Sequence, residues 1–299
     1  MRIGTVAWDL EDPDTPELTR VGQDLGHDMT MFFLEDVGCR SVGSYVEPTI
    51  KSEPVANFDI IISRGQIHYE NAQLDHERYS LLCSVPGVTV VDPADAYLNA
   101  ESKLMGLQRL SAAGLPIAPT RTCANLTEVA DALAEWGTIV LKPSFGLGGR
   151  DVERIYNLDE DRPTVEVLLK KYQSLICQPY YPHPEGDVRV LIIGDEAVLT
   201  YNRMPAPDGW KANFKSGATS RLIPPDPDLV AISRKATQVM DISIAGLDFL
   251  PTPNGYRIIE INTCPGWTSV GEADRRRVCE AIIDVAVTRH EARHESRSA

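Results

Sequence analysis

Near the C-terminal end, two apolar runs are separated by a short turn, and this pattern constrains the fold more than any other part of the chain. Residues 244–250 and 256–262 are rich in β-branched and other apolar residues, and Pro253-Asn254-Gly255 lies between them. A turn of this composition between apolar runs is typical of neighbouring strands. The pattern therefore predicts two strands paired across a short turn.

The predicted hairpin carries oxygen-bearing side chains inside its strands. Glu260 and Asn262 are two residues apart, so their side chains leave the same face. Ile259 and Ile261 face the opposite way, into apolar packing. If Asp248 on the first strand points the same way as Glu260, three oxygen donors converge, which suits Mg²⁺. A solvated sheet face is the alternative, but a strand that ends in a Cys-Pro-Gly turn favours the metal site.

The first hundred residues alternate short apolar runs with polar segments of helical character. Strands are predicted at residues 2–8, 29–34, 58–63 and 88–91, and helices at residues 16–26 and 72–84. Strands separated by helices favour a parallel sheet, so the predicted class is α/β. A Gly-x-Gly-x-x-Gly fingerprint is missing after the first strand, which leaves a Rossmann dinucleotide site unsupported.

Further elements are predicted along the rest of the chain. Helices are expected at residues 102–113, 126–136, 165–172, 227–240 and 272–289, and strands at residues 138–142, 152–155, 175–178, 188–193 and 196–203. A polar loop is expected at residues 205–218. The tail after His290 is charged and has little to bury, so we expect it to be frayed or disordered.

A lysine precedes a glycine-rich loop in the middle of the chain. Lys142 ends a predicted strand, and the loop contains Gly146, Gly148 and Gly149. Closely spaced glycines let backbone N–H groups approach a phosphate, and the lysine adds a positive charge. The loop lacks the Gly-Lys-Ser/Thr ending of a Walker motif. From these residues alone, a phosphate site and an ordinary turn are equally supported.

Cationic and amide side chains form a third group between these two motifs. Arg189 and Arg203 lie on successive predicted strands, and Lys211 and Asn213 follow in the polar loop. Each alone is most simply a solvated surface residue. As a set along paired strands, they are placed to neutralise a transferring phosphoryl group or an acyl phosphate.

Taken in order, these segments resemble the ATP-grasp ligases, and within them the carboxylate–amine ligases of the ribosomal-protein-glutamate and lysine-biosynthesis type. The resemblance covers residues 99–289. Its motifs are Asn99-x-x-x-Lys103, Leu141-Lys142-Pro143 with its glycine loop, Gln178-Pro179-Tyr180-Tyr181, Asp187-Val188-Arg189-Val190, Trp210-Lys211-Ala212-Asn213, Gly246-Leu247-Asp248 and Glu260-Ile261-Asn262-x-x-Pro265-Gly266. It implies an α/β ATP-grasp fold behind an N-terminal parallel-sheet domain, with a substrate-side domain at residues 1–98, a lid subdomain at 99–177 and a catalytic subdomain at 178–299.

The resemblance also implies a role for each matching residue. It places in the nucleotide site Lys103, Lys142, Gly146, Gly148, Gly149, Gln178, Tyr180, Tyr181 and Asp187. The two lysines would hold the ATP phosphates, the loop at residues 144–150 would close over them as a lid, and residues 178–181 would form the hinge beside adenine. The hinge of the family usually has an acidic residue beside the position of Pro179, and this departure puts the adenine and ribose contacts in doubt. Lys211 stands where an arginine is commoner, which puts bidentate carboxylate recognition in doubt.

The implied reaction uses ATP and two Mg²⁺ ions, with Mn²⁺ as an alternative metal. The predicted metal ligands Asp248, Glu260 and Asn262 would carry the ions between the β- and γ-phosphates. Arg203 would stabilise an acyl phosphate and the later tetrahedral intermediate, Arg189 would help orient the substrate, and Asn213 would complete the catalytic set. A substrate carboxylate attacks the γ-phosphate, and an amine then displaces phosphate. The reaction needs no side-chain nucleophile, so Cys264 is expected to pack.

Net charge and cysteine content limit the classes of partner and the cellular compartment that are expected for this chain. The net charge is −14, which repels nucleic acids and anionic membranes. No apolar run approaches the roughly 20 residues that a membrane span needs, and no signal peptide is visible. The cysteines are scattered without a Cys-x-x-Cys pair, at positions 39, 83, 123, 177, 264 and 279. A reduced cytoplasmic protein with a small-molecule substrate is expected.

Two other classes of function compete with the ligase. The segment His290-Glu291-Ala292-Arg293-His294 matches the His-Glu-x-x-His zinc-protease signature. Its charged surroundings cannot supply the buried groups that orient zinc ligands, so the match is interpreted as accidental. A nucleotide-binding regulatory module without turnover is the second alternative, and the intact metal ligands argue against it.

The substrate is the least determined part of the prediction. Length and layout are similar to the ATP-grasp enzymes that cyclise O-ureido-D-serine to D-cycloserine in antibiotic biosynthesis. An intermolecular ligase joining an amino acid to an amine, a peptide or a protein terminus is the alternative. Candidates for substrate selection are Trp8, Arg64, Gln66 and the segment Trp267-Thr268-Ser269. Relatives of this fold are often homo-oligomers, while the sequence itself indicates no oligomeric state.

Overall fold

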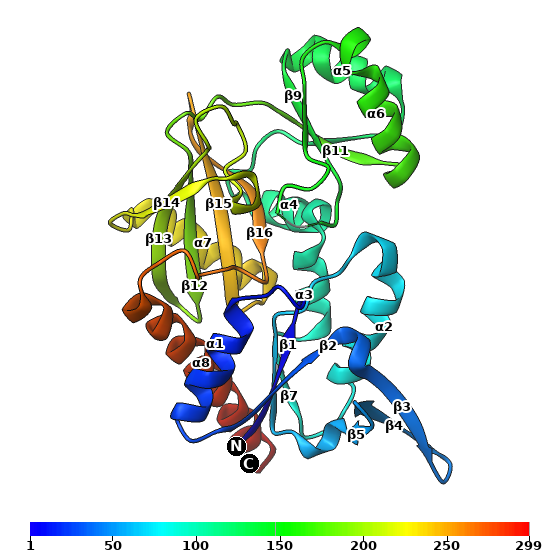
Figure 1. Ribbon diagram of the computed structural model, residues 1–299, viewed down its shortest axis with the longest axis vertical. Coiled ribbons are helices and arrows are strands. Elements are labelled where there is room, and N and C mark those ends of the chain that lie inside the picture. The colour runs from blue at the N-terminus through cyan, green and yellow to red at the C-terminus, as the bar shows by residue number, and fades with distance from the viewer. Residues whose placement is uncertain (147, 299) are drawn as a thin grey trace.

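The protein is described by a computed structural model that covers residues 1–146 and 148–298. Figure 1 shows a parallel sheet near the two chain ends, an antiparallel sheet above it, and a smaller unit of helices and strands at the opposite end of the molecule. Leu147, part of the predicted lid loop, lies outside the described residues. The α/β class predicted from the sequence is confirmed.

The N-terminal part forms a parallel sheet in the order β2-β1-β6-β7. Its strands are β1 (Arg2–Ala7), β2 (Asp28–Phe33), β6 (Ile60–Ser63) and β7 (Thr89–Val91), and its helices are α1 (Asp14–Asp24) and α2 (Ala72–Cys83). All of β6 is buried, because helices and loops cover both faces of the sheet, as in other parallel sheets. The four predicted strands and two helices of this part are confirmed to within a few residues.

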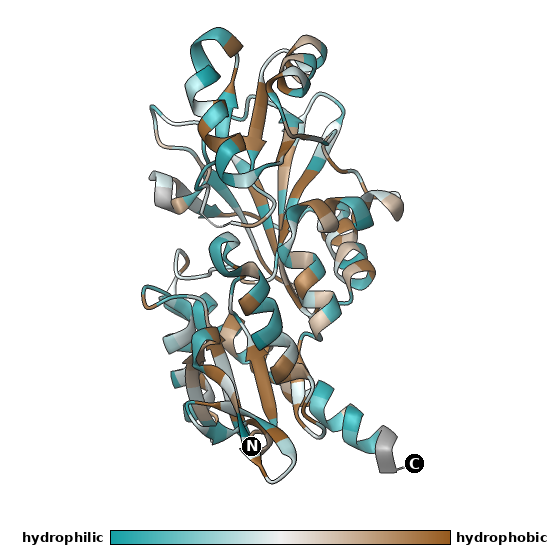
Figure 2. Ribbon diagram, turned by 90° about the vertical axis from the view of Figure 1, so that its right-hand side faces the viewer, coloured by the Kyte–Doolittle hydropathy of each residue, from teal (hydrophilic) through white to brown (hydrophobic). Residues whose placement is uncertain are grey.

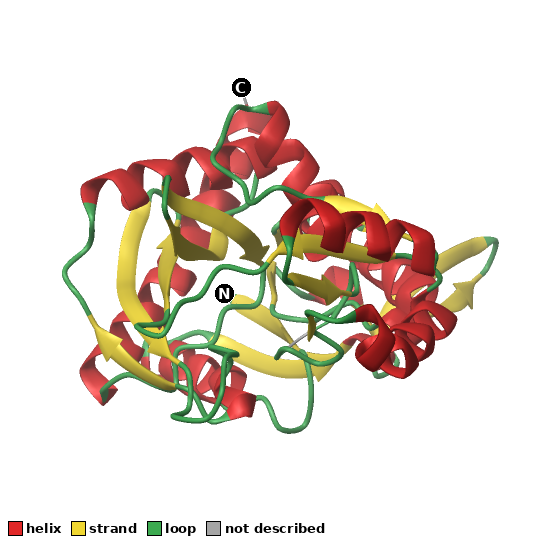
Figure 3. Ribbon diagram, turned by 90° about the horizontal axis from the view of Figure 1, so that it is seen from above, coloured by secondary structure: helices red, strands yellow, loops and turns green. Residues whose placement is uncertain are grey.

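A hairpin that the sequence did not predict projects from this sheet (Figure 3). It comprises β3 (Val37–Val42) and β4 (Tyr45–Ile50), with a short third strand β5 (Glu53–Pro54), flanked by the 3₁₀ turns η1 (Leu34–Asp36) and η2 (Val55–Asn57). Most of the hairpin is exposed towards its tip. A ribbon that is exposed on both faces lacks the alternating apolar pattern by which a half-buried strand is recognised.

The small unit is an antiparallel sheet covered by two helices. Its sheet runs β10-β9-β11-β8, formed by β8 (Arg121–Cys123), β9 (Ile139–Lys142), β10 (Glu153–Ile155) and β11 (Leu175–Pro179). The helices are α5 (Leu126–Trp136) and α6 (Leu158–Tyr172). Helix α6 begins earlier than the predicted residue 165, because the Asn157 side chain caps it by accepting from the N–H of Asp159. Pro163 is tolerated inside the helix.

The small unit also touches the N-terminal part. The rings of Tyr172 on α6 and Tyr69 in η3 (Tyr69–Asn71) meet edge to face, with centroids 4.7 Å apart. Beside them, the Nζ of Lys171 lies 3.7 Å from a carboxylate oxygen of Glu70 and 2.8 Å from one of Asp151. Because Asp151 directly follows the glycine loop, these contacts connect the loop to the N-terminal part.

The C-terminal part contains the antiparallel sheet that carries most of the predicted site residues. Its order is β14-β13-β12-β15-β16, with β12 (Asp187–Ile193), β13 (Glu196–Met204), β14 (Thr219–Leu222), β15 (Ile244–Thr252) and β16 (Gly255–Asn262). The predicted pairing of residues 244–250 with 256–262 is confirmed. One face packs against α3 (Ala94–Glu101), α4 (Lys103–Ala112) and α7 (Pro227–Met240).

The other face of this sheet divides into two halves. Leu191 and Ile193 bury their side chains against α8 (Glu272–Ser298) and the N-terminal sheet, in one continuous apolar core. Asp187 and Arg189 lie on the same face of β12 further from α8, since alternate residues of a strand share a face. Figure 2 shows several strands of the sheets coloured as predominantly hydrophobic, whereas the helices carry both hydrophilic and hydrophobic residues. The polar half of the face is therefore the half that the core leaves uncovered.

The prediction of a frayed tail after His290 is wrong. Helix α8 continues to Ser298, and its part around His290 and Arg293 contacts the segment around β7. The Nδ1 of His290 lies 3.0 Å from the Oγ1 of Thr89, and Arg293 donates to the Val88 carbonyl at 2.8 Å. These partners lie far away in the sequence, so the charge of the tail alone did not reveal them. Among the described residues, none of the helices has the length and apolar character required to cross a membrane.

The predicted division at residues 98 and 177 stays a prediction. Helix α4, which that division assigns to the lid subdomain, packs on β16 and α7 of the C-terminal part. The apolar cluster of the small unit runs from Cys123 to Cys177. We accordingly describe the small unit, from β8 to β11, as the lid unit.

Candidate active site

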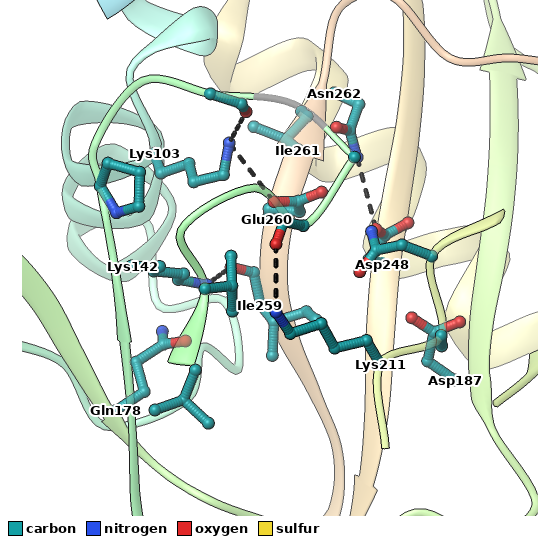
Figure 4. Close-up of a pocket in the computed structure, with 18 of the residues that line it drawn as sticks. Lys103, Lys142, Gln178, Asp187, Lys211, Asp248, Ile259, Glu260, Ile261 and Asn262 are labelled. Carbon is teal, nitrogen blue, oxygen red and sulfur yellow. Dashed lines mark hydrogen bonds and ion pairs between the residues drawn. The ribbon is translucent and has the colours of Figure 1, made fainter. Parts of the chain in front are cut away.

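A cleft lies where the lid unit, the C-terminal sheet and the loop after β6 meet. Its lining includes every predicted nucleotide and metal residue, together with Arg203, Lys211 and Asn213. Gln66 and His68 contribute from the N-terminal part, and Glu101 from the end of α3. The cleft is thus built from segments far apart in the sequence (Figure 4).

Strand register places the predicted metal ligands on one face of the sheet. Asp248 on β15 pairs with Glu260 on β16, and Gly246 pairs with Asn262. Directly opposed residues in antiparallel strands project to the same side. The Asn262 amide nitrogen lies 3.5 Å from a carboxylate oxygen of Asp248. The convergence expected from the sequence is therefore present.

A β-bulge changes one part of the expected strand pattern. Asp248 pairs with Glu260, but the next residue, Phe249, pairs with Ile258 rather than with Ile259. Ile258 is buried, whereas Ile259 lines the cleft. The prediction that Ile259 packs opposite Glu260 is wrong, because an extra residue in one strand interrupts the alternation. The Ile259 carbonyl accepts a hydrogen bond from the Nζ of Lys142 at 3.1 Å.

Two aspartates and two arginines alternate beneath the cleft. Arg189 holds both oxygens of Asp248, at 2.6 and 2.7 Å, and Arg203 reaches the same carboxylate at 2.6 Å. Arg203 also holds both oxygens of Asp187. All four side chains are buried. Burial opposes ionisation of Asp248, but the two guanidinium groups hold the pKa of its carboxyl well below the ordinary value.

The predicted phosphate-binding lysines approach the metal ligands from two different elements, Lys103 from the start of α4 and Lys142 from the end of β9. The Nζ of Lys103 lies 2.7 Å from the Gly146 carbonyl and 3.6 Å from a carboxylate oxygen of Glu260. Lys142 is buried, and desolvation lowers the pKa of its ammonium to about 8. Figure 4 shows both lysines directed towards the strand that carries Glu260.

The glycine loop lies against the polar loop at residues 205–218. A Cβ on Gly149 would sit 2.6 Å from the Oδ1 of Asn213, and its φ of +76° suits glycine. The Nζ of Lys211 lies 3.4 Å from the Gly149 carbonyl and 3.5 Å from a carboxylate oxygen of Glu153. Lys211 and Asn213 therefore contact the glycine loop, which the sequence did not predict.

The predicted hinge segment forms the side of the cleft nearest the lid unit. The Gln178 side chain donates to the Oγ1 of Thr120 at 2.9 Å. The ring of Tyr180 meets that of Trp210 edge to face, with centroids 5.8 Å apart, and the Arg154 guanidinium lies 5.1 Å from the Tyr180 ring centre. This side of the cleft therefore offers aromatic faces next to cationic groups.

Several candidates lie away from the cleft. Arg189 is not among the described residues that line it; it pairs with Asp248 across neighbouring strands, and its guanidinium holds that carboxylate. Arg64 and Trp267 are fully buried, with the guanidinium carbon 4.2 Å from the Trp267 ring centre. Both residues therefore belong to the packing between the N-terminal and C-terminal parts. Trp8 lines a smaller neighbouring cavity.

The described residues contain no group of three or more His, Cys, Asp and Glu side chains arranged to hold a metal. The His-Glu-x-x-His segment accordingly gives no zinc site there. The donor set of Asp248, Glu260 and Asn262 is smaller, with two carboxylates and an amide. Such a set suits Mg²⁺, which takes few protein ligands and completes its shell with water and nucleotide phosphates.

Sequence reasoning missed some residues of the cleft. Glu101 accepts from the N–H of Ile67 at 3.0 Å and from the hydroxyl of Thr263, so it joins the N-terminal part to the end of β16. His183 lies just beyond the hinge, and its Nδ1 is 2.7 Å from the Tyr181 carbonyl. The only signal for Glu101 was its position two residues before Lys103. His183 stands among prolines in a segment without periodicity.

Comparison with known proteins identifies the family. A family profile described as "RimK-like ATP-grasp domain" matches residues 100–285. The chain belongs to the RimK-like ATP-grasp family. This RimK-like protein is 25% identical to a curated relative from Xanthomonas euvesicatoria pv. vesicatoria named "Probable alpha-L-glutamate ligase", with 100% of each chain covered.

Solved structures show the same fold for this RimK-like protein. The crystal structure of D-cycloserine synthetase DcsG superposes with a TM-score of 0.72 at 21% identity, covering 94% of this chain and 99% of that one. The ATP-grasp ligase PsnB, complexed with a phosphomimetic variant of its minimal precursor, Mg and ADP, superposes with a TM-score of 0.69 at 18% identity over 95% and 98% of the chains. The predicted ATP-grasp fold is therefore confirmed, and the protein is a member of a ligase family that uses ATP and Mg²⁺.

Proposed function

We propose that this protein is an ADP-forming ligase that converts the carboxylate of a small amino acid into an acyl phosphate, which an amine-type nitrogen then attacks. One observation carries the proposal: lysines from two walls of a cleft face a sheet on which Asp248 and Glu260 are directly paired. A cleft with cations on one side and carboxylates on the other suits a metal–nucleotide complex.

The chain's own residues would hold the nucleotide. Lys103 and Lys142 supply positive charge, and the glycine loop supplies backbone N–H groups, to the phosphates. The hinge at residues 178–181, with the ring of Tyr180, would hold the adenine. Asp187 is engaged by Arg203 in the structure, so we assign it to orienting that arginine beside the nucleotide.

The donor set on β15 and β16 would hold Mg²⁺, through Asp248, Glu260 and Asn262. When bound, the metal neutralises charge on the phosphates and favours their transfer. Arg189 and Arg203 keep the carboxylate of Asp248 ionised and fixed in direction, which prepares it to bind a cation. We accordingly assign Arg189 to positioning Asp248 rather than to contact with substrate.

The reaction balances without a nucleophile from the protein. A carboxylate oxygen of the substrate bonds to the γ-phosphorus, and the bond from that phosphorus to the β,γ-bridging oxygen breaks, releasing ADP. The amine nitrogen then bonds to the acyl carbon, phosphate leaves with the C–O electron pair, and the nitrogen loses its proton. Arg203 and Asn213 would stabilise the charge that develops on oxygen. The closed lid excludes the water that would hydrolyse the acyl phosphate.

For the substrate, we propose intramolecular cyclisation of O-ureido-D-serine to D-cycloserine, a step of antibiotic biosynthesis. The similarity to D-cycloserine synthetase over nearly the whole of both chains supports this choice. An intermolecular amino-acid or peptide ligase is the second candidate, supported by the curated relatives named alpha-L-glutamate ligases and by PsnB with its precursor. A regulatory module without turnover is disfavoured, because such a module has no need of the assembled lysines and carboxylates.

The test is ADP release with Mg·ATP over a panel of amino acids, each alone and with an added amine, with products identified by mass. ADP release and a cyclised product from O-ureido-D-serine alone are expected. ADP release only from paired substrates would exclude cyclisation and leave the intermolecular ligase. Binding of Mg·ATP without substrate-dependent ADP under any condition would support the regulatory module.

A further inference from the structure

The loop after β6 is held in place at nearly every residue. The Arg64 carbonyl accepts from the thiol of Cys264 at 3.0 Å, and the Gly65 carbonyl accepts from the hydroxyl of Tyr97. Further along, the N–H of Ile67 donates to Glu101 at 3.0 Å, and the N–H of His68 donates to Asp75 at 3.2 Å. The loop is therefore fixed before any ligand arrives.

Gln66 is the exception within this fixed loop. Its Oε1 atom is buried and has no hydrogen-bond partner among the described residues. A buried acceptor without a partner is rare in native proteins and is costly unless a ligand or water satisfies it. Gln66 lines both the nucleotide cleft and a smaller neighbouring cavity. The residue that carries the unpaired acceptor thus borders both spaces.

The smaller cavity opens at the carboxyl ends of β1, β2 and β6. Residues that follow these strands line it, among them Trp8, Leu34 and His68. Strand β1 pairs with β2 on one side and with β6 on the other. The order in which strands are added to the sheet therefore changes side between β1 and β6, which makes this position a topological switch point. Open parallel sheets bind their ligands in the crevice outside such a switch point.

Negative charge exceeds positive charge around this crevice. Asp75 is paired with Arg78 at 3.7 Å, but Asp9 and Glu35 form no ion pair with any described residue. The adjoining nucleotide cleft carries Lys103 and Lys142. A substrate that spans the two spaces therefore meets cations at one end and carboxylates at the other, which favours a molecule with a carboxylate and a cationic nitrogen.

We propose that Gln66 determines specificity by accepting a hydrogen bond from a cationic nitrogen of the substrate, and that the crevice formed with Asp9 and Glu35 selects small amine-bearing substrates over acidic ones. This inference rests on the proposed function, because it assigns the substrate end of the same cleft. It places the reacting carboxylate near the lysines and the cationic nitrogen near the β1–β6 switch point.

The test measures binding to the whole protein by calorimetry, with Mg·ADP present so that no turnover occurs. The probes are serine and 2,3-diaminopropionate, of both configurations, together with their N-acetyl derivatives and glutarate. Acetylation removes the cationic nitrogen and keeps the carboxylate. We expect the amino compounds to bind and the N-acetyl compounds and glutarate to bind at least tenfold more weakly.

Three variants test which residues cause the preference for amino compounds. Gln66→Leu removes the acceptor at similar volume and is expected to weaken amino-compound binding roughly tenfold to hundredfold, as for a lost hydrogen bond to a charged group. Gln73→Leu, at an exposed glutamine on α2, is the matched control and should bind as wild type. Glu35→Gln, at an exposed position, should weaken binding less and reduce its dependence on salt.

Unchanged binding in Gln66→Leu, equal binding of the N-acetyl compounds, or no binding of any amino compound while Mg·ADP binds would overturn the inference and leave the proposed function standing. Failure of the wild-type protein to bind Mg·ADP would instead overturn the proposed function and this inference with it. Equal Mg·ADP affinity in wild type and Gln66→Leu also shows that the variant is folded.

Discussion

Replacing the buried Arg64 should destabilise the junction between the N-terminal and C-terminal parts. Its guanidinium donates to the Pro265 carbonyl at 3.0 Å and lies 3.4 Å from a carboxylate oxygen of Asp14 and 3.7 Å from one of Asp12. Its face covers the ring of Trp267. Removing one partner of a buried ion pair costs about 3–5 kcal/mol. We expect Arg64→Leu to lose that much unfolding free energy in urea titrations at neutral pH.

The unfolding free energy lost in Arg64→Leu should depend on pH, and the ionisation of Asp14 sets the direction of that dependence. Burial raises the pKa of the Asp14 carboxyl, and Arg64 opposes that rise. Without the arginine, the pKa of Asp14 in the folded protein rises further above its value in the unfolded chain. A raised carboxyl pKa favours the folded state at low pH and costs stability as pH increases. The difference between wild type and Arg64→Leu should therefore widen from about pH 4 to neutrality.

A second substitution tests the cause. In Arg64→Leu combined with Asp14→Asn, no carboxylate remains at position 14, and the amide still offers an oxygen to the N–H groups of Trp267 and Thr268. We expect this double variant to be more stable at neutral pH than Arg64→Leu alone. Arg20→Leu, which removes an exposed pair with Asp24, is the control and should behave as wild type. A pH-independent loss with no recovery in the double variant would refute the ion-pair explanation.

Three further predictions concern the cleft. Lys142→Met should raise the Kd for Mg·ATP about tenfold or more in calorimetry, because a charge-assisted contact is lost, and Lys142→Arg should lose less. Cys264→Ala should leave turnover unchanged, since burial raises the pKa of that thiol. In the wild-type protein, iodoacetamide should first modify the exposed Cys39, which mass spectrometry can map. Tyr69→Ala removes the ring contact with Tyr172. The ratio of ADP released to product formed should then rise, because a less firmly held lid admits water. An unchanged ratio would exclude a role of this contact in holding the lid.

Elements with strong local signals were predictable from the sequence. Helix α7 begins at Pro227 after Asp226, whose side chain accepts from two backbone N–H groups, and this start is visible in the residues themselves. The pairing of β15 with β16 follows from the turn and the apolar runs. The hairpin of β3 and β4 was missed because it is exposed, and α3 was missed because its short segment carries no distinctive period.

The residues of the candidate site were predictable from the sequence, but their spatial arrangement was not. Strand parity placed Glu260 and Asn262 together, and register added Asp248. The bulge that turns Ile259 towards the cleft depends on strand pairing, which residue types do not encode locally. The pairing of Arg189 with Asp248 likewise emerges only when β12 and β15 are aligned. Motifs and spacing identify which residues form the site. The position of each residue within the site can be read only from the tertiary structure.

Helix α8 has a consequence for the size of molecule that the enzyme accepts. It packs on strands of both the N-terminal sheet and the C-terminal sheet, in one apolar core. Gln66 follows a strand of the first sheet and Glu260 lies on the second. Under the proposed function, we expect this shared core to hold the distance between the two ends of the substrate space. Homologous compounds longer or shorter by one methylene would fit poorly, a mismatch that costs about 1–3 kcal/mol. We therefore expect selectivity by chain length to depend on helix α8, which contributes no described residue to the cleft or to the smaller cavity.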